Sequence, residues 1–259
     1  AAHAQHMPSH TFTRVGMWQE SVDANARSKA VALKEANYGE ALHASDYAMY
    51  AYLQMGKEAE AKAILDGLPE LAAKFDPNVI GGAAPGSAGV FALAAIPARW
   101  VMERGAWSEA AALEPKASAY LYPEAMTYFA RAIGASHTGD LPRAKASADS
   151  LSAIQARIAA KGDAYWAEQV AIQQLGARAW IDLAEHRDND ALARMREAVS
   201  REDATEKSAV TPGPLAPARE LLGDMLLALK RPADAAAEYR ATLKKEPGRR
   251  HSMLRVSGT

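Results

Sequence analysis

Small and apolar residues recur in a fixed order on either side of predicted helical turns, most clearly near the C-terminal end of the chain. Leu222-Gly223 lies on a predicted helix that ends near Lys230, and Arg231-Pro232 begins a second helix. This second helix carries small and aromatic residues before a proline ends it: Ala235, Ala236, Tyr239, Thr242 and then Pro247. Small residues let two antiparallel helices approach closely, and the aromatic ring fills the space toward the next pair. The pattern predicts an antiparallel helix pair.

Similar turns occur upstream, at Gly16, Gly56, Gly105 and Gly139, and a fifth without glycine lies near His186–Asn189. Glycine enters the left-handed conformation at a helix end without a steric penalty, so each glycine marks the end of a first helix. A Leu-Gly pair, a small residue after the turn, an aromatic residue and a closing proline are typical of tetratricopeptide units. We therefore predict an all-α fold, a right-handed superhelical solenoid of degenerate tetratricopeptide-like helix pairs.

Two stretches rich in Gly and Pro interrupt the helical pattern, because such residues do not continue a helix. They are residues 75–89 and 201–217. We predict four segments: 1–73 with two helix pairs, 74–86 as a linker, 87–201 with irregular pairs, and 202–259 with the terminal unit and tail. The chain begins without Met in the middle of a predicted helix, so we expect further residues upstream.

Composition narrows the function classes. The 259 residues carry 30 basic and 31 acidic side chains, and a nucleic-acid-binding protein would need a basic stripe, so we expect no nucleic-acid partner. The chain has no cysteine, which excludes disulfides and thiolate metal sites. No apolar run approaches the length of a membrane span, so we expect a soluble protein without membrane insertion. Neither cytoplasm nor periplasm is favoured.

One group of residues has the spacing of a chemical site. His3, His6 and His10 recur at i, i+3 and i+7, which places them along one face of a helix. The same spacing links His43, Asp46 and Tyr50, with Tyr47 beside them, on what we predict to be the first helix of the next unit. First helices of tetratricopeptide units line the concave surface. We therefore predict a binding groove formed by His6, His10, His43, Asp46, Tyr47 and Tyr50.

Three interpretations of this group are open. The first is a module that binds a protein or peptide partner in the groove, with no cofactor and no catalytic residues. The second is a metal-binding protein or metal-dependent hydrolase in which His6, His10, His43 and Asp46 hold a divalent metal. The third is a structural network of hydrogen bonds, with His43 and Asp46 as a pair. His-x-x-x-His without the zincin glutamate does not decide among them, and Pro8 disturbs the helix unless it lies in a first turn.

The opening residues 6–18, with the sequence HMPSHTFTRVGMW, and the later helix 43–54, with the sequence HASDYAMYAYLQ, resemble a group of bacterial tetratricopeptide-repeat proteins. The resemblance covers residues 1 to about 70 closely, while the region 75–210 matches by pattern alone. Known members are longer and have no assigned activity. The resemblance therefore implies a fold, and a C-terminal portion of a longer protein, but no reaction.

Overall fold

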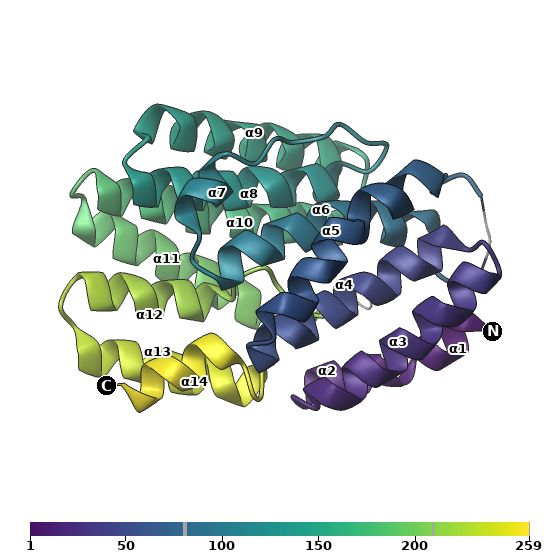
Figure 1. Ribbon diagram of the computed structural model, residues 1–259. Helices are drawn as coiled ribbons and strands as arrows, with labels where there is room; N and C mark the ends of the chain where they lie inside the picture. The colour runs from purple at the N-terminus through teal and green to yellow at the C-terminus, as the bar shows by residue number, and fades with distance from the viewer. Residues whose placement is uncertain (80–81, 209, 259) are drawn as a thin grey trace. The chain divides into compact units, whose positions relative to one another are not determined.

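The computed structural model describes residues 1–79, 82–208 and 210–258, and every regular element in these ranges is a helix. The prediction of an all-α fold is confirmed for them (Figure 1). The helices are α1 (Ala2–His6), α2 (Pro8–Arg14), α3 (Trp18–Lys34), α4 (Tyr38–Met55), α5 (Glu58–Lys74), α6 (Gly86–Glu103), α7 (Trp107–Ala111), α8 (Leu121–Thr138), α9 (Leu141–Ala160), α10 (Ala164–Ala184), α11 (Asp188–Asp203), α12 (Ala218–Ala228), α13 (Pro232–Lys245) and α14 (Arg250–Ser257).

The four predicted glycine turns all adopt the left-handed conformation. Gly16, Gly56, Gly105 and Gly139 have φ between 62° and 80°. At the fifth turn His186 takes the same conformation with φ 60°, so this turn forms without glycine as predicted. Further left-handed turns, at Ala36, Gly162 and Lys230, separate α3 from α4, α9 from α10 and α12 from α13. The turn residues thus account for most of the borders between consecutive helices.

The predicted linker 74–86 falls between two helices, since α5 ends at Lys74 and α6 begins at Gly86. Residues 80–81 of this linker lie outside the described ranges. The chain divides into two compact units whose borders differ from the predicted segments. Unit 1 comprises residues 1–100, 207–214 and 245–251, and unit 2 comprises residues 101–206, 215–244 and 252–259.

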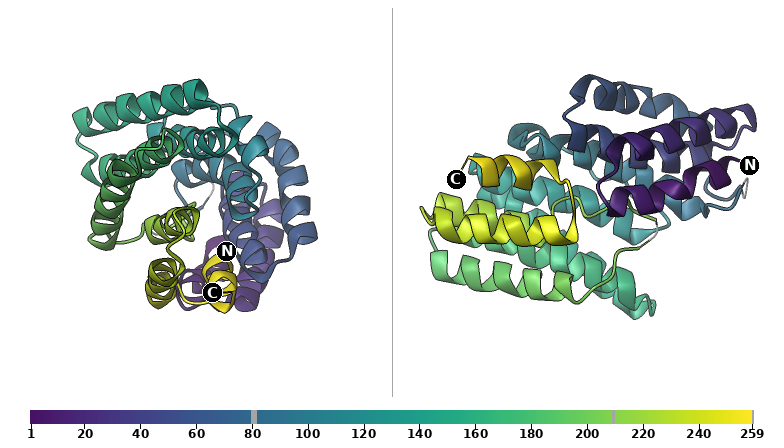
Figure 2. Two further views of the ribbon diagram at one scale, coloured as in Figure 1. Left: turned by 90° about the vertical axis from the view of Figure 1, so that its left-hand side faces the viewer. Right: turned by 90° about the horizontal axis from the view of Figure 1, so that it is seen from below.

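In unit 1, α3 packs against α1, α2 and α4, and α4 in turn packs against α5 (Figure 2, purple to blue). Contacts of α1 and α2 with α4 place the first and fourth helices of the chain beside each other. Nearly all residues of α4 are buried, including polar ones such as Glu40, His43 and Asp46. A helix buried on all sides is normally apolar, so the polar side chains of α4 call for an explanation.

In unit 2, helices α9, α8, α10 and α11 lie side by side (Figures 1 and 2). Helix α8 packs against both α9 and α10, and α10 packs against α11 and α12. Small residues allow the close approaches: a Cβ atom on Gly134 of α8 would lie 2.6 Å from the backbone of α7. Gly223 of α12 is similarly covered by the ring of Tyr239, the aromatic residue that the sequence pattern placed after the turn.

The prediction on membrane insertion is consistent with these helices. Within the described part of the chain, none combines the length and the apolar character that crossing a bilayer requires.

Candidate metal centre

Three of the four predicted metal ligands lie together. His6 is on α1, His10 on α2 and His43 on α4, and one ring nitrogen from each lies within 4.8 Å of the other two. The ring centroid of His6 is 4.7 Å from that of His10 and 4.4 Å from that of His43. Pro8 occupies the first turn of α2, where a backbone N–H has no partner within the helix, so the N–H that proline lacks is not missed. Met7, between α1 and α2, keeps a helical conformation, so His6 and His10 stay close together.

The hydrogen bonds of Asn25 determine which nitrogen of His6 faces the group. The Asn25 side-chain amide donates from Nδ2 to the backbone oxygen of Ser21 over 2.7 Å. Its Oδ1 therefore faces His6 and accepts from Nδ1–H over 2.6 Å. In a neutral imidazole the other nitrogen then carries the lone pair. This nitrogen, Nε2 of His6, is buried and has no hydrogen-bond partner among the described residues.

His10 and His43 also present buried ring nitrogens without a hydrogen bond. Nδ1 of His10 lies 3.2 Å from the hydroxyl of Tyr47, while its Nε2 has no partner among the described residues. Nδ1 of His43 likewise has none. The ring of Tyr47 borders all three imidazoles, with centroid separations of 4.7 to 5.3 Å. Each of the three imidazoles thus has a nitrogen without a partner among the described residues, and all three rings lie beside the ring of Tyr47.

The interior keeps these histidines neutral. Burial lowers the pKa of His6 to about 4, against the hydrogen bond to Asn25, and the neighbouring His10 and His3 lower it further. Burial also lowers the pKa of His10 and, well below its usual range, that of His43. A protonated imidazole cannot bind a metal, whereas a neutral one offers a lone pair. The site is therefore in its ligating form at neutral pH.

Asp46, the fourth predicted ligand, is not part of this group. Its Oδ1 accepts from Nε of Arg99 over 2.8 Å, and both side chains are almost completely buried. Burial raises the pKa of the Asp46 carboxyl, and the guanidinium beside it opposes this rise. The pairing of His43 with Asp46, part of the third interpretation, is not found. Arg99, 53 residues further along the chain, donates to Oδ1 of Asp46, while Oδ2 is buried and has no hydrogen-bond partner among the described residues.

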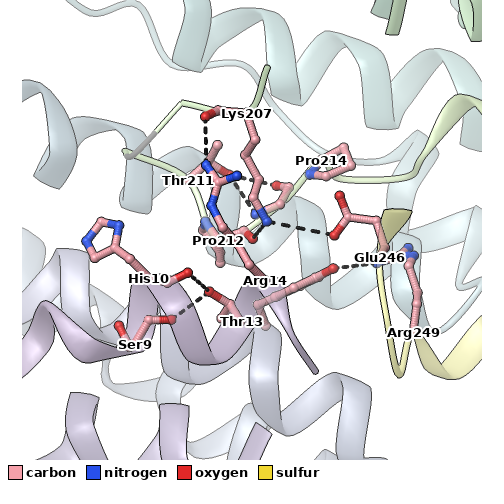
Figure 3. A network of polar contacts seen from close by, with 12 residues as sticks. Ser9, His10, Thr13, Arg14, Lys207, Thr211, Pro212, Pro214, Glu246 and Arg249 are labelled. Atoms are coloured by element: carbon pink, nitrogen blue, oxygen red, sulfur yellow. Dashed lines mark hydrogen bonds and ion pairs between the residues drawn. The ribbon is translucent and has the colours of Figure 1, made fainter. Parts of the chain in front are cut away.

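Arg99 also holds the loop 207–214. Its Nη atoms donate to the hydroxyl of Thr211 and to the backbone oxygens of Gly213 and Pro214, over 2.9 to 3.2 Å. In the close view of Figure 3, Arg14 donates to the backbone oxygen of Lys207 from the side of α2 that carries His10. Nζ of Lys207 donates to the oxygen of Pro212 and lies 3.8 Å from the carboxylate of Glu246. These hydrogen bonds hold the loop in place on the side of α2 that carries His10.

Tyr50, also predicted to line a groove, is completely buried. Arg249 donates to its hydroxyl over 3.1 Å, and the guanidinium of Arg99 lies 5.0 Å from its ring centroid. His6, His43, Asp46 and Tyr47 are at most 3% exposed. These side chains are interior groups, and a protein partner does not reach them in this conformation.

Sequence reasoning missed Asn25, Arg99 and Arg249. Asn25 lies nine residues after the turn at Gly16, the position that the aromatic Tyr239 takes after the turn at Lys230, so a polar amide there was a signal that could have been followed. Arg99 is a single basic residue without a local pattern, and Arg249 belongs to the basic C-terminal segment, whose spacing does not indicate a buried contact. No protein-family model matches the chain, and no curated protein matches it.

Proposed function

We propose that unit 1 binds one divalent first-row transition-metal ion through Nε2 of His6, Nε2 of His10 and a ring nitrogen of His43. One observation carries the proposal: three neutral imidazoles on three helices present ring nitrogens within 4.8 Å of one another, and each imidazole has a buried nitrogen without a hydrogen bond among the described residues. An isolated buried histidine gives no such convergence.

The energy of these open nitrogens supports a ligand. A buried polar atom without a partner costs about 1–3 kcal/mol relative to a hydrogen-bonded one. Three such atoms in one place are expensive for a structural network, which would have paired them. A metal ion satisfies all three at once. The hydrogen bond from His6 to Asn25 has the form of the outer interactions that orient metal-bound histidines.

The three imidazole donors limit which metal ions suit the site. Imidazole nitrogens suit Zn²⁺, Cu²⁺ and Ni²⁺, while Mg²⁺ and Ca²⁺ prefer oxygen. Zinc–nitrogen bonds of 2.0–2.1 Å in a tetrahedron require nitrogens about 3.3 Å apart, so nitrogens within 4.8 Å of one another need to approach by up to about 1.5 Å. We take Zn²⁺ as the probe. A hydrolase would also need a carboxylate that acts as a base, and Asp46 is occupied by Arg99, so our proposal is limited to binding.

We also infer that the helices belong to a tetratricopeptide-like array. Left-handed turns at the predicted glycines and the succession of contacts from α8 to α10 to α12 support this inference. A role in binding a protein or peptide partner, and a bacterial origin, stay predictions from the sequence pattern and the resemblance.

The test measures metal in protein purified without a polyhistidine tag. We expect one zinc per chain by titration calorimetry, and loss of this binding in His43→Ala with the helical circular dichroism retained. The matched control is His137→Ala, because the ring contacts of His137 among the described residues are with Trp107 and Trp180 and not with another histidine. Wild-type protein that binds no zinc, copper or nickel ion at neutral pH contradicts the proposal.

A further inference from the structure

A fourth histidine lies beside the three proposed ligands. The ring centroid of His3 is 5.7 Å from that of His6 and 6.5 Å from that of His43. His3 precedes His6 by three residues on α1, so both side chains leave the same face of the helix. It is only half-buried, in contrast to His6 and His43, and its ring nitrogens are outside the group of three.

Glu40 sets the tautomer of His3. One carboxylate oxygen of Glu40 lies 3.2 Å from Nδ1 of His3, and the other accepts from the backbone N–H of Ala84 over 2.8 Å. An ionised carboxylate only accepts hydrogen bonds, so Nδ1 of His3 carries the hydrogen and Nε2 the lone pair. Glu40 itself is 1% exposed. Its position is fixed by α4 and by Asn37, which caps that helix by accepting from the backbone N–H of Glu40.

A carboxylate that accepts from one nitrogen of a histidine while the other nitrogen binds metal is a common arrangement in metal sites. It orients the ring and makes the ligating nitrogen more basic. Here the carboxylate has a second effect. Three neutral imidazoles around a divalent ion would leave two positive charges in the interior. Arg99 is paired with Asp46, and Lys207 lies near Glu246, so these charges largely offset one another. The carboxylate of Glu40, beside His3, would therefore supply the negative charge that the ion gains from.

We propose that His3 is the fourth ligand of the same ion, with Glu40 as the positioning residue that orients it. The proposal rests on the proposed function, since it assumes that His6, His10 and His43 hold a metal. His3 comes from the half-exposed side of the group, so it completes the coordination last and is the ligand that an incoming molecule displaces. A water molecule in the fourth position is the competing arrangement.

The decisive measurement is the NMR signal of the histidine ring nitrogens in ¹⁵N-labelled protein during a zinc titration. We expect Nε2 of His3, assigned by its absence in His3→Ala, to shift together with the ring nitrogens of His6, His10 and His43. The assignment uses a half-exposed residue, so the variant is expected to fold. If His3 stays unshifted at saturating zinc while the other three move, His3 is not a ligand. If no histidine moves, the proposed function itself fails.

Affinity supplies a second readout. Competition with a chelating dye should show zinc binding weakened about 10- to 100-fold in Glu40→Gln, the range found for orienting partners of metal ligands. In His3→Ala, which removes the ligand itself, the loss should be at least as large. The matched controls are His186→Asn, an exposed histidine in a left-handed turn that asparagine tolerates, and Glu35→Gln, an exposed acid at the end of α3. Equal affinities of His3→Ala and wild type would overturn the proposal.

Discussion

The two units differ in what they bury. Among the described residues, sixteen buried polar or charged side chains belong to unit 1 and seven to unit 2, although unit 2 contains more residues. The interior of unit 2 is built from Ala, Leu, Ile, Met and aromatic residues, as expected for packed helices. A polar interior is less favourable unless its groups are paired. The excess in unit 1 agrees with the metal site that we propose there.

The same contrast between the two units is seen in the burial and ring contacts of two histidines, His6 and His137. His6 in unit 1 is completely buried, and its free nitrogen faces other imidazoles. His137 in unit 2 stacks on Trp107 with 4.1 Å between ring centroids and lies 4.2 Å from Trp180, but its edge reaches solvent. Desolvation lowers the pKa of both. A lowered pKa is therefore common to a proposed metal ligand and a histidine stacked on tryptophan. The two differ in that His6 lies in a group of three histidines whose ring nitrogens converge.

The largest effect is expected at the buried ion pair of unit 1. Replacing Arg99 with Met leaves the Asp46 carboxylate buried without its partner, which should lower the free energy of unfolding by about 3–5 kcal/mol. The matched change in unit 2 is Arg178→Met, which breaks a pair with Asp149 whose side chains are 34% and 70% exposed. Arg178→Met should lower the free energy of unfolding by about 0–1 kcal/mol. Urea denaturation of both variants measures the difference, and equal losses would remove the distinction between the two interiors.

Acid should destabilise unit 1 through His6. Its pKa is about 4 in the folded chain and 6.5 in the unfolded chain, so the unfolded chain binds a proton first as the pH falls. Above pH 6.5 the difference between the two pKa values of His6 has no effect on stability. Between pH 6.5 and 4, about 3 kcal/mol is lost, at about 1.4 kcal/mol per pH unit. Urea denaturation at pH 7 and pH 4 should show a smaller loss in His6→Gln than in wild type.

For His137 we expect a smaller change with pH, because its exposed edge is screened by solvent. A variant His137→Gln with the same acid sensitivity as wild type fits this expectation. If instead His137→Gln removes more of the acid sensitivity than His6→Gln does, the comparison between the two histidines is wrong.

Asn25 should affect metal binding more than folding. In Asn25→Ala, His6 loses the acceptor that fixes its tautomer, and zinc affinity should fall about 10-fold. The control Asn189→Ala removes an exposed asparagine in the first turn of α11 and should leave the affinity unchanged. Chelator competition at pH 7 measures both. An unchanged affinity in Asn25→Ala would show that His6 selects its tautomer without help.

The smallest difference between the two units is expected at the turn glycines. Gly139 has φ 80° and open space around it, so Gly139→Ala should lower stability by about 1–2 kcal/mol through the backbone conformation alone. A Cβ atom on Gly56 in unit 1 would also meet the guanidinium of Arg250 at 3.0 Å. The loss in Gly56→Ala should therefore be somewhat larger. Thermal denaturation of the two variants tests this order, and the reverse order would mean that Arg250 moves aside freely.

Local spacing predicted much of this molecule. The glycine turns follow from the conformational freedom of one residue, and the histidine group follows from helical periodicity together with the pairing of first helices. None of the three interpretations included Arg99 as the partner of Asp46, because Arg99 is distant in sequence and no local pattern points to it. The loop 207–214 contributes to the network for the same reason. Interactions set by tertiary packing leave no periodic signal.

The contacts of Arg99 also bear on the order in which the chain folds. Arg99 joins residue 46 to residues 211–214, more than a hundred positions later. Unit 1 further includes residues 245–251, where the backbone oxygen of Gly248 accepts from the indole of Trp18. During synthesis, residues 1–100 therefore leave the ribosome well before residues 207–214 and 245–251, which complete the interior of unit 1. Until then the buried polar groups of residues 1–100 lack some of their partners. Contacts so far apart in sequence slow folding.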